Sequence, residues 1–256
     1  MEYALITGAS GGIGYALAEV FAAEGWGLLL SGSDPARLAE AGARLAERFD
    51  TSVRLFAQDL SRPGSARLLY EQVSAAELEA AALVNGAGFG LLGPAEALDI
   101  DREEAMLEVN MVSLTTLTKL CLAEMKARGR GYILNIASTG AFQPGPYNAG
   151  YFASKAYVLS YTRAVRHEAR GSGVHISALC PGTTETGFFA REEVPIPGGA
   201  MAAGEVALAG YWGVMRNRAV IVPGLRNRIL RLAPVGVKMD AVGRVKQRQI
   251  RKREGA

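Results

Sequence analysis

The sequence predicts an α/β fold, a doubly wound parallel sheet in a single domain. Short apolar runs of strand length alternate with longer stretches of helical spacing, which is typical of βαβ units around a parallel sheet. The first apolar run, 3–7, ends in a glycine cluster, as expected of a buried first strand. No repeat, low-complexity stretch or linker precedes residue 225. Right-handed crossovers then place a ligand at the carboxyl ends of the strands.

The elements follow in order along the chain. We predict strands at 3–7, 26–30, 53–57, 83–85, 132–137, 174–179 and 219–222. We predict helices at 13–24, 35–49, 63–73, 102–128, 151–170 and 205–215. Gly25 suits a helix stop, 31–33 a loop, and Asp34 with Pro35 a helix start. Residues 1–224 would be the catalytic domain, with a substrate lid near 187–215, and 225–256 a basic amphipathic extension.

The composition is that of an ordinary globular protein, 49% apolar and 21% charged. Cys121 and Cys180 lie in apolar runs and are expected to be buried free thiols in a reducing compartment. We expect no signal peptide at the start of the chain and no membrane span in its apolar runs, so the cytoplasm is the expected location. His167 and His175 are not clustered with other ligands, and no metal site is predicted.

The segment Thr7-Gly8-Ala9-Ser10-Gly11-Gly12-Ile13-Gly14 joins the first strand to the first helix. Glycines there permit a tight turn and a close approach of the backbone to a pyrophosphate, which rests on the helix N-terminus. The position between a strand and a helix favours dinucleotide binding over a plain structural turn.

Tyr151 and Lys155 are spaced at i and i+4, so on a helix they share one face. An ammonium beside a phenol favours the phenolate and lowers the tyrosine pKa from its free value of roughly 10. A tyrosine of this kind can transfer protons near neutral pH. Together with the glycine loop, the pair indicates a hydride-transfer enzyme.

The ordered motifs resemble those of the short-chain dehydrogenase/reductase family over roughly residues 3–222. They are Thr-Gly-x-x-x-Gly-x-Gly at 7–14, Asp59-Leu60, Asn85-Gly86-Ala87-Gly88, Asn110, Ser138, Tyr151-x-x-x-Lys155 and Pro181-Gly182-x-x-x-Thr186. The resemblance implies a Rossmann-like sheet and reversible reduction of a ketone or aldehyde to an alcohol with NAD(P). The chain departs from the family after 222, where many relatives end in Asp-Gly-Gly.

The resemblance also implies roles for four catalytic residues. Tyr151 would be the general acid/base, and Lys155 would assist it and hold the nicotinamide ribose. Ser138 would hydrogen-bond the substrate oxygen, and Asn110 would position a water in a proton relay. Donors placed where charge develops on the substrate oxygen stabilise the transition state. The purely structural alternatives are a helix N-cap for Ser138 and a buried, hydrogen-bonded core amide for Asn110.

Further residues are expected to bind the cofactor. They are Gly8, Ser10, Gly12, Ile13, Gly14, Ser33, Asp59, Leu60, Asn85, Ala87, Gly88, Tyr151, Lys155, Pro181, Gly182 and Thr186. Asp59 would contact the adenine, or else cap the end of its strand. Asn85 would stabilise its strand end as much as touch a ligand, and 181–186 would bracket the nicotinamide carboxamide.

The choice between NAD and NADP depends on the end of the second strand. An acid there would bind the ribose 2′-hydroxyl of NAD, but Gly32 and Ser33 occupy that place. Asp34 lies 20 residues after Gly14, and its neighbour Pro35 favours an N-cap role. Because the NAD-reading acid is absent, we favour NADP, although Gly11 lacks the basic side chain common in NADP-preferring relatives.

The segment 225–256 carries ten Lys and Arg against two acids, a net +8, so the preceding residues carry −5 of the total of +3. It resembles a basic amphipathic helix interrupted near 234–236. It could be a solvated extension, lie on an anionic membrane surface, cover the substrate cleft or pack on a partner subunit. No nucleic-acid partner is expected.

The sequence thus predicts an NAD(P)-dependent oxidoreductase of an apolar carbonyl or alcohol, because Phe188 and Phe189 fall in the lid. Two alternatives are a non-enzymatic dinucleotide-binding regulator or scaffold, and a membrane-surface reductase of lipid-derived carbonyls. A homodimer through the helices at 102–128 and 151–170 is expected, or a homotetramer.

Overall fold

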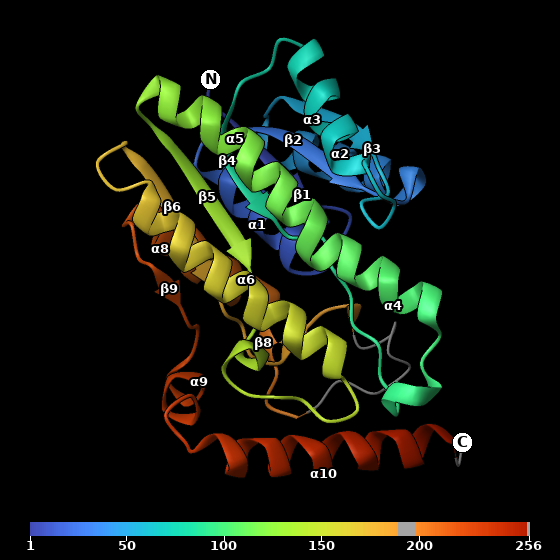
Figure 1. Cartoon of the computed structure of the whole chain (residues 1–256). Coiled ribbons are helices and arrows are strands. Elements are labelled where there is room, and N and C mark those ends of the chain that lie inside the picture. The colour runs from blue at the N-terminus through green and yellow to red at the C-terminus, as the bar shows by residue number, and fades with distance from the viewer. Residues whose placement is uncertain (189–197, 255–256) are drawn as a thin grey trace.

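The computed structural model describes residues 1–188 and 198–254 (Figure 1). Its centre is a parallel sheet of seven strands in the order β3-β2-β1-β4-β5-β6-β9. The strands are β1 Tyr3–Thr7, β2 Gly27–Gly32, β3 Val53–Ala57, β4 Ala80–Asn85, β5 Gly131–Ile136, β6 Val174–Leu179 and β9 Val220–Ile221. A separate pair joins β7 Thr184–Glu185 to β8 Met201–Ala202.

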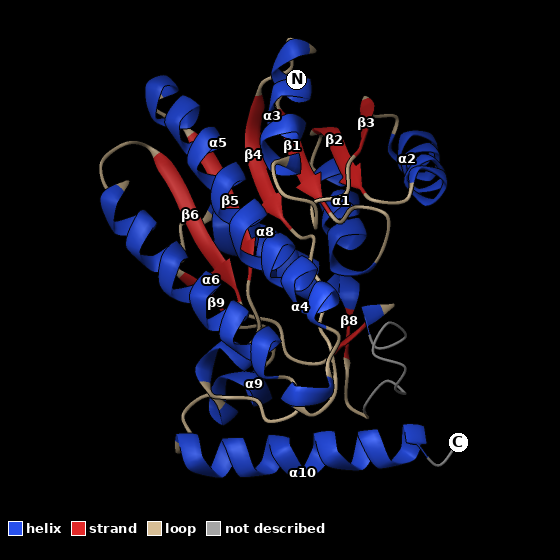
Figure 2. Cartoon of the chain, turned by 45° about the vertical axis from the view of Figure 1, so that its right-hand side comes forward, coloured by secondary structure: helices blue, strands red, loops and turns tan. Residues whose placement is uncertain are grey.

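Helices cover both faces of the sheet (Figures 1 and 2). They are α1 Gly12–Ala23, α2 Pro35–Phe49, α3 Ser65–Ala75, α4 Ile100–Leu107, α5 Leu114–Arg128, α6 Ala149–Glu168, α8 Ala203–Met215, α9 Leu225–Leu230 and α10 Val235–Glu254. Short helical turns lie at η1 Ala95–Ala97, η2 Glu108–Ser113 and η3 Thr139–Phe142. The predicted doubly wound α/β fold is therefore confirmed.

The apolar side chains of β1 pack into two hydrophobic clusters, one on each face of the sheet. Ala4 and Ile6 pack into the cluster that includes α1 and α8, whereas Leu5 packs into the cluster that includes α3 and α5. All three are fully buried. Successive side chains of a strand point to opposite faces, so an uninterrupted apolar run is what a strand covered on both sides requires.

The order of the strands places the functional edge. The chain runs outward from β1 to β3, then returns to β4 on the other side of β1. The carboxyl ends of β1 and β4 therefore form a topological switch point, where doubly wound sheets bind ligands. Thr7 ends β1 and Asn85 ends β4, so the two glycine-containing motifs that follow them lie side by side.

Several predicted element bounds were wrong. The strand predicted to end at residue 30 continues as β2 to Gly32, because Leu30, Ser31 and Gly32 pair with β3. The strand predicted from 83 begins at Ala80. The helix predicted at 102–128 is divided by the π-helical turn η2, which inserts a wider turn that the apolar spacing does not reveal.

The stretch Ile100–Arg128 is long and apolar enough to cross a bilayer by length and composition, which the sequence reading had not recognised. In the fold it packs on the sheet, where Leu117, Cys121 and Met125 belong to a core cluster. Cys121 and Cys180 are both buried free thiols, as predicted. Burial raises the pKa of each thiol to about 12.

Candidate functional site

The glycine loop between β1 and α1 is shaped by two close backbone approaches. Gly8 adopts a left-handed φ of 69°, and a Cβ there would lie 2.9 Å from the backbone of Ala87. A Cβ on Gly14 would lie 2.3 Å from the carbonyl oxygen of Gly8. Both positions require glycine, because any side chain would displace the loop from the helix or from β4.

A threonine hydroxyl joins this loop to β4. The Oγ1 atom of Thr7 accepts hydrogen bonds from the backbone N–H groups of Gly86, at 3.0 Å, and Ala87, at 3.1 Å. The contact fixes the gap between the two strand ends at the switch point. Thr7 belongs to the Thr-Gly-x-x-x-Gly-x-Gly motif at 7–14, but the sequence analysis did not predict it as a site residue.

The N-terminus of α1 fits an anionic group. Gly11 caps the helix without a side-chain hydrogen bond, and the first turn contains no acidic residue. Helix N-termini of this kind bind phosphates through free N–H groups and the helix dipole. Ile13 lies in this first turn, and Thr186 lies 3.3 Å from the position of a Cβ on Gly12. The 181–186 segment therefore approaches the same helix end.

At the end of β2, Asp34 is engaged as a helix cap. Its Oδ1 atom accepts from the N–H groups of Ala36, at 3.0 Å, and Arg37, at 3.1 Å. The predicted N-cap role is confirmed. The Oγ atom of Ser10 lies 3.3 Å from the position of a Cβ on Gly32, whereas Ser33 is exposed.

Arg37 is a residue that the sequence reading missed. Its Nη2 atom lies 3.5 Å from the position of a Cβ on Gly11. The guanidinium of Arg37, an exposed residue of α2, therefore lies beside the glycine loop and the end of β2. The sequence places Arg37 in the first turn of a helix capped by Asp34. Only the fold shows that this turn faces the glycine loop.

Asp59 and Leu60 follow β3. Asp59 accepts hydrogen bonds from the N–H and Oγ–H groups of Ser61, at 3.1 and 2.7 Å. Partial burial opposes ionisation of this carboxyl, but Ser61 and the charge of Arg62 outweigh it and hold the pKa below its usual value. The backbone oxygen of Leu60 accepts from Ser113 at 2.7 Å. Asp59 thus caps the strand end, which does not prevent a further contact.

Asn85 belongs to a buried polar network beneath the site. Its Nδ2 atom donates to Asn135 Oδ1, at 2.8 Å, and to Thr118 Oγ1, at 3.0 Å. Asn135 in turn donates to Thr162 at 3.0 Å. The network ties β4 to β5, α5 and α6, so Asn85 stabilises the strand end. Its own Oδ1 atom has no hydrogen-bond partner among the described residues.

Asn110 lies in the π-helical turn η2 and is fully buried. Its Nδ2 atom donates to the Phe89 carbonyl and to Ser154 Oγ, both at 3.0 Å, and its Oδ1 atom accepts from Phe89 N–H at 3.3 Å. The amide therefore holds the segment after β4. A Cβ on Gly88 would lie 2.6 Å from Asn110 Oδ1 and 3.5 Å from Lys155 Nζ, which places this segment against both residues.

Tyr151 and Lys155 lie one turn apart on α6, as the spacing predicted. The Lys155 ammonium lies 5.7 Å from the centre of the Tyr151 ring and donates to the Ile136 carbonyl at 3.0 Å. Burial lowers the pKa of Lys155 to about 8. The ring of Phe188 packs against Tyr151, with the two ring centres 5.3 Å apart. Phe189, the second expected lid residue, lies outside the described residues.

Ser138 follows β5, two residues after the carbonyl that binds Lys155. Its Oγ atom accepts from Gly140 N–H at 3.0 Å, so it caps η3. Thr139 N–H donates to the Pro181 carbonyl at 2.8 Å. Asn227 lies 2.6 Å from the position of a Cβ on Gly182. The 181–186 segment therefore runs between the Ser138 loop and α9.

This geometry fits a dinucleotide, and the similarity of the chain to known dehydrogenases makes it an oxidoreductase of the class that acts on CH–OH groups. The sequence profile of the short chain dehydrogenase family matches residues 2–194. The chain belongs to the short-chain dehydrogenase family.

Named relatives and solved structures resemble the chain over most of its length. A sulfoacetaldehyde reductase of Chromohalobacter salexigens is 32% identical over 189 residues, 73% of this chain and 74% of that protein. A 7beta-hydroxysteroid dehydrogenase of Collinsella aerofaciens is 27% identical over 208 residues, 81% and 77%. The structure of a Sphingobium yanoikuyae short-chain dehydrogenase with NADPH superposes with a TM-score of 0.83, at 29% identity, covering 96% of this chain and 94% of that one.

Proposed function

We propose that the chain is an NADP-dependent enzyme that interconverts a ketone or aldehyde with an alcohol. The observation that carries the proposal is the position of Lys155. Its ammonium is bonded to the last carbonyl of β5 and lies beside the Tyr151 ring. It thereby holds the strand end that leads into Ser138 against the helix that carries Tyr151.

Each polar side chain has a role in this reaction. Tyr151 donates its hydroxyl proton to the oxygen of the carbonyl as charge develops there, and takes it back in the reverse direction. Ser138 donates a hydrogen bond to the same oxygen. Lys155 supplies positive charge beside the phenol. Asn110 is a positioning residue, because its amide holds the Phe89 segment and Ser154.

The glycine loop and the α1 N-terminus would hold the pyrophosphate of the cofactor, which supplies the hydride when bound. Three features support NADP over NAD. Asp34 is engaged as a cap, Arg37 lies beside Gly11, and the Sphingobium relative is described in complex with NADPH. A 2′-phosphate at the end of β2 would meet the Arg37 guanidinium and Ser10, which is an ordinary way to bind that group.

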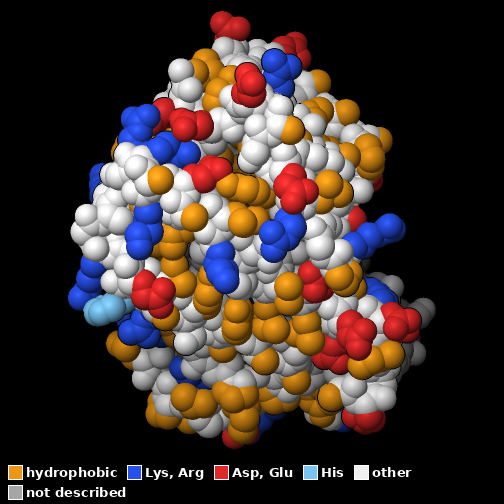
Figure 3. Space-filling view, turned by 45° about the horizontal axis from the view of Figure 1, so that its top comes forward, with side chains coloured by type: hydrophobic (Ala, Val, Ile, Leu, Met, Phe, Trp, Pro, Cys, Tyr) orange, Lys and Arg blue, Asp and Glu red, His pale blue; other side chains and the backbone are white. Residues whose placement is uncertain are grey.

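Exposed and partly buried apolar side chains support a proposal for the kind of substrate and for the assembly. Phe188 against Tyr151 favours an apolar group on the substrate. Hydrophobic side chains gather over the face on which α5 and α6 lie (Figure 3), including Val112 and Tyr157, 49% and 39% exposed. A homodimer through α5 and α6 would cover them. The cytoplasmic location stays a prediction.

Cofactor binding and turnover test the proposal separately. NADPH and NADH binding would be measured by fluorescence, followed by cofactor oxidation with ketones and aldehydes graded by chain length. We expect NADPH binding and turnover that increases with apolar length. Tyr151→Phe should bind NADPH normally and lose turnover by about 10²–10⁴-fold. Unimpaired turnover in Tyr151→Phe would refute the mechanism, and NADPH binding without turnover of any carbonyl would favour a regulator.

A further inference from the structure

The helix α9 exposes its apolar side chains. Leu225 and Ile229 of α9 and Leu232, two residues beyond its end, are 71%, 60% and 77% exposed. Leu225 and Ile229, four residues apart, lie on one side of the helix, and Leu230 beside them is 51% exposed. Surface helices of globular proteins normally turn such a stripe toward the core. Large apolar side chains on the solvent side therefore require another explanation.

Three polar side chains of α9 and of the residue after it contact the body of the protein. Arg228 Nε donates to the Val222 carbonyl at 3.0 Å, and Asn227 Nδ2 donates to the Pro223 carbonyl at 2.8 Å. The Arg231 guanidinium lies 5.5 Å from the centre of the Phe142 ring. The hydrogen bonds of Asn227 and Arg228 thus fix α9 on the body of the protein, with Leu225 and Ile229 outward.

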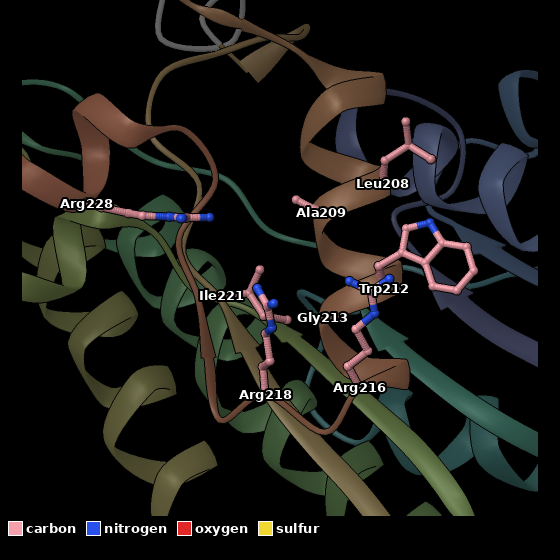
Figure 4. A pocket seen from close by; sticks show the side chains of 8 residues that line it. All are labelled: Leu208, Ala209, Trp212, Gly213, Arg216, Arg218, Ile221 and Arg228. Atoms are coloured by element: carbon pink, nitrogen blue, oxygen red, sulfur yellow. The ribbon is translucent and has the colours of Figure 1, made fainter.

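The helix α10 extends this surface with positive charge. It contains seven basic residues against two acids, and most of the seven are exposed. Val235, Val237 and Val245 are also at least half exposed. Three more guanidinium groups, those of Arg216, Arg218 and Arg228, surround a hollow between α8, β9 and α9 (Figure 4). Apolar and cationic side chains are therefore interspersed from β9 to the end of α10.

We propose that residues 225–254 dock the protein on an anionic lipid bilayer. The α9 leucines and Ile229 would enter the boundary between headgroups and acyl chains, and the basic side chains would contact anionic headgroups. Exposed apolar residues flanked by Lys and Arg are the composition that binds such interfaces. The net charge of +8 on 225–256 supplies the electrostatic part of the affinity.

Two other occupants fit the surface less well. In a two-fold dimer the same patch meets itself, so a second copy would bring another +8 against the first. A nucleic acid would neutralise the charge but would leave Leu225, Ile229 and Leu232 in water. An anionic bilayer satisfies both kinds of side chain.

The helix α10 of the docking surface packs against loops that follow β4 and β5, the strands that lead into the proposed active site. Figures 1 and 2 show α10 crossing beneath the loops at the carboxyl ends of the strands. Lys238 Nζ donates to the Phe142 carbonyl at 3.1 Å. Ile250 is buried against Leu92 and Tyr147. If the proposed function holds, a docked enzyme would take apolar carbonyl substrates that reside in the bilayer.

Vesicle sedimentation with the full chain tests the docking. Phosphatidylcholine vesicles with and without phosphatidylserine would be compared at low and high salt. We expect binding to the anionic vesicles to be at least about tenfold stronger than to the neutral ones, and to weaken with salt. The variant Leu225→Ser/Ile229→Ser/Leu232→Ser should bind at least about tenfold more weakly. The matched control is Leu55→Ser/Leu68→Ser/Ile100→Ser, which changes three exposed apolar residues elsewhere and should bind as the wild type does.

Each outcome has one meaning. Absence of wild-type binding, equal binding by the Leu225 triple variant, or tighter binding of duplex DNA than of anionic vesicles would overturn the docking. Thermal unfolding of each variant shows that it is folded. Sedimentation needs no turnover, so vesicle binding without carbonyl reduction would refute only the proposed reaction, and reduction of water-soluble ketones without vesicle binding would refute only the docking.

Discussion

At the scale of single residues, most of the proposed site side chains are also held by the protein. Ser138 caps η3, Asp59 caps a strand end, and Asn110 has its amide bonded to Phe89 and Ser154. Each of these residues therefore has the structural role, as a cap or as a hydrogen-bonded amide, that was its alternative interpretation. The structural role does not compete with the proposed catalytic or binding role. A reaction that needs accurate placement of a side chain requires neighbours that hold that side chain in place.

Arg37 gives a prediction about cofactor choice. Arg37→Ala should lower NADPH affinity by roughly 10–100-fold and leave NADH affinity unchanged, because only NADPH carries the phosphate that a guanidinium would bind. Titration of both cofactors by fluorescence measures the effect. Arg67→Ala, at an exposed arginine of α3, is the control and should change neither. An equal loss for both cofactors would show that Arg37 does not read the phosphate.

Lys155 gives a prediction about pH and stability. Burial lowers its pKa from 10.5 to about 8, so the folded chain binds fewer protons than the unfolded chain between those values. The stability contributed at this residue therefore rises with pH across that window. The difference in unfolding free energy between wild type and Lys155→Met should grow in favour of the wild type by about 1–3 kcal/mol from pH 8 to 10.

Urea unfolding at a series of pH values measures this difference. The same substitution at the exposed Lys119 should give a difference that does not change with pH in this way. A flat difference for Lys155→Met would mean that the ammonium is not penalised in the fold.

At the scale of elements, the glycine loop depends on the space between its own atoms. Gly14→Ala would force a Cβ to within 2.3 Å of the Gly8 carbonyl oxygen. We expect a loss of about 2 kcal/mol of stability, seen as a fall of roughly 5 °C in Tm without cofactor, together with weakened NADPH binding. Gly11→Ala, whose Cβ would lie 3.5 Å from Arg37, should unfold at nearly the wild-type temperature. Equal Tm values would show that α1 can shift.

The sequence predicted the elements well where spacing and chemistry coincide. The order of strands and helices, the cap at Asp34 and the shared face of Tyr151 and Lys155 follow from local patterns. The π-helical turn could not be predicted, because residues 108–113 contain no Gly or Pro that would mark a break in the helix. The outward position of Leu225 and Ile229 on α9 could not be predicted either, since an amphipathic pattern does not state which face of a helix meets the body.

At the scale of the whole molecule, the face of α5 and α6 predicts the assembly. Tyr157 bonds Thr115 at 2.9 Å and stacks on Tyr161, so it presents a fixed, flat apolar surface. Tyr157→Glu with Val112→Glu should convert the proposed dimer to a monomer, because charges would be buried at the interface. Size-exclusion chromatography with light scattering measures the mass. Leu68→Glu, on the exposed side of α3, should leave the mass unchanged, and a monomeric wild type would refute the dimer.

The sheet is complete at β9, which ends at Ile221. Among the described residues, none from 222 to 254 belongs to a strand, and the family profile stops earlier still, at residue 194. Removal of residues 225–254 would therefore leave every strand pairing of the central sheet in place, so the surface that those residues form can be altered without changing the sheet that carries the site.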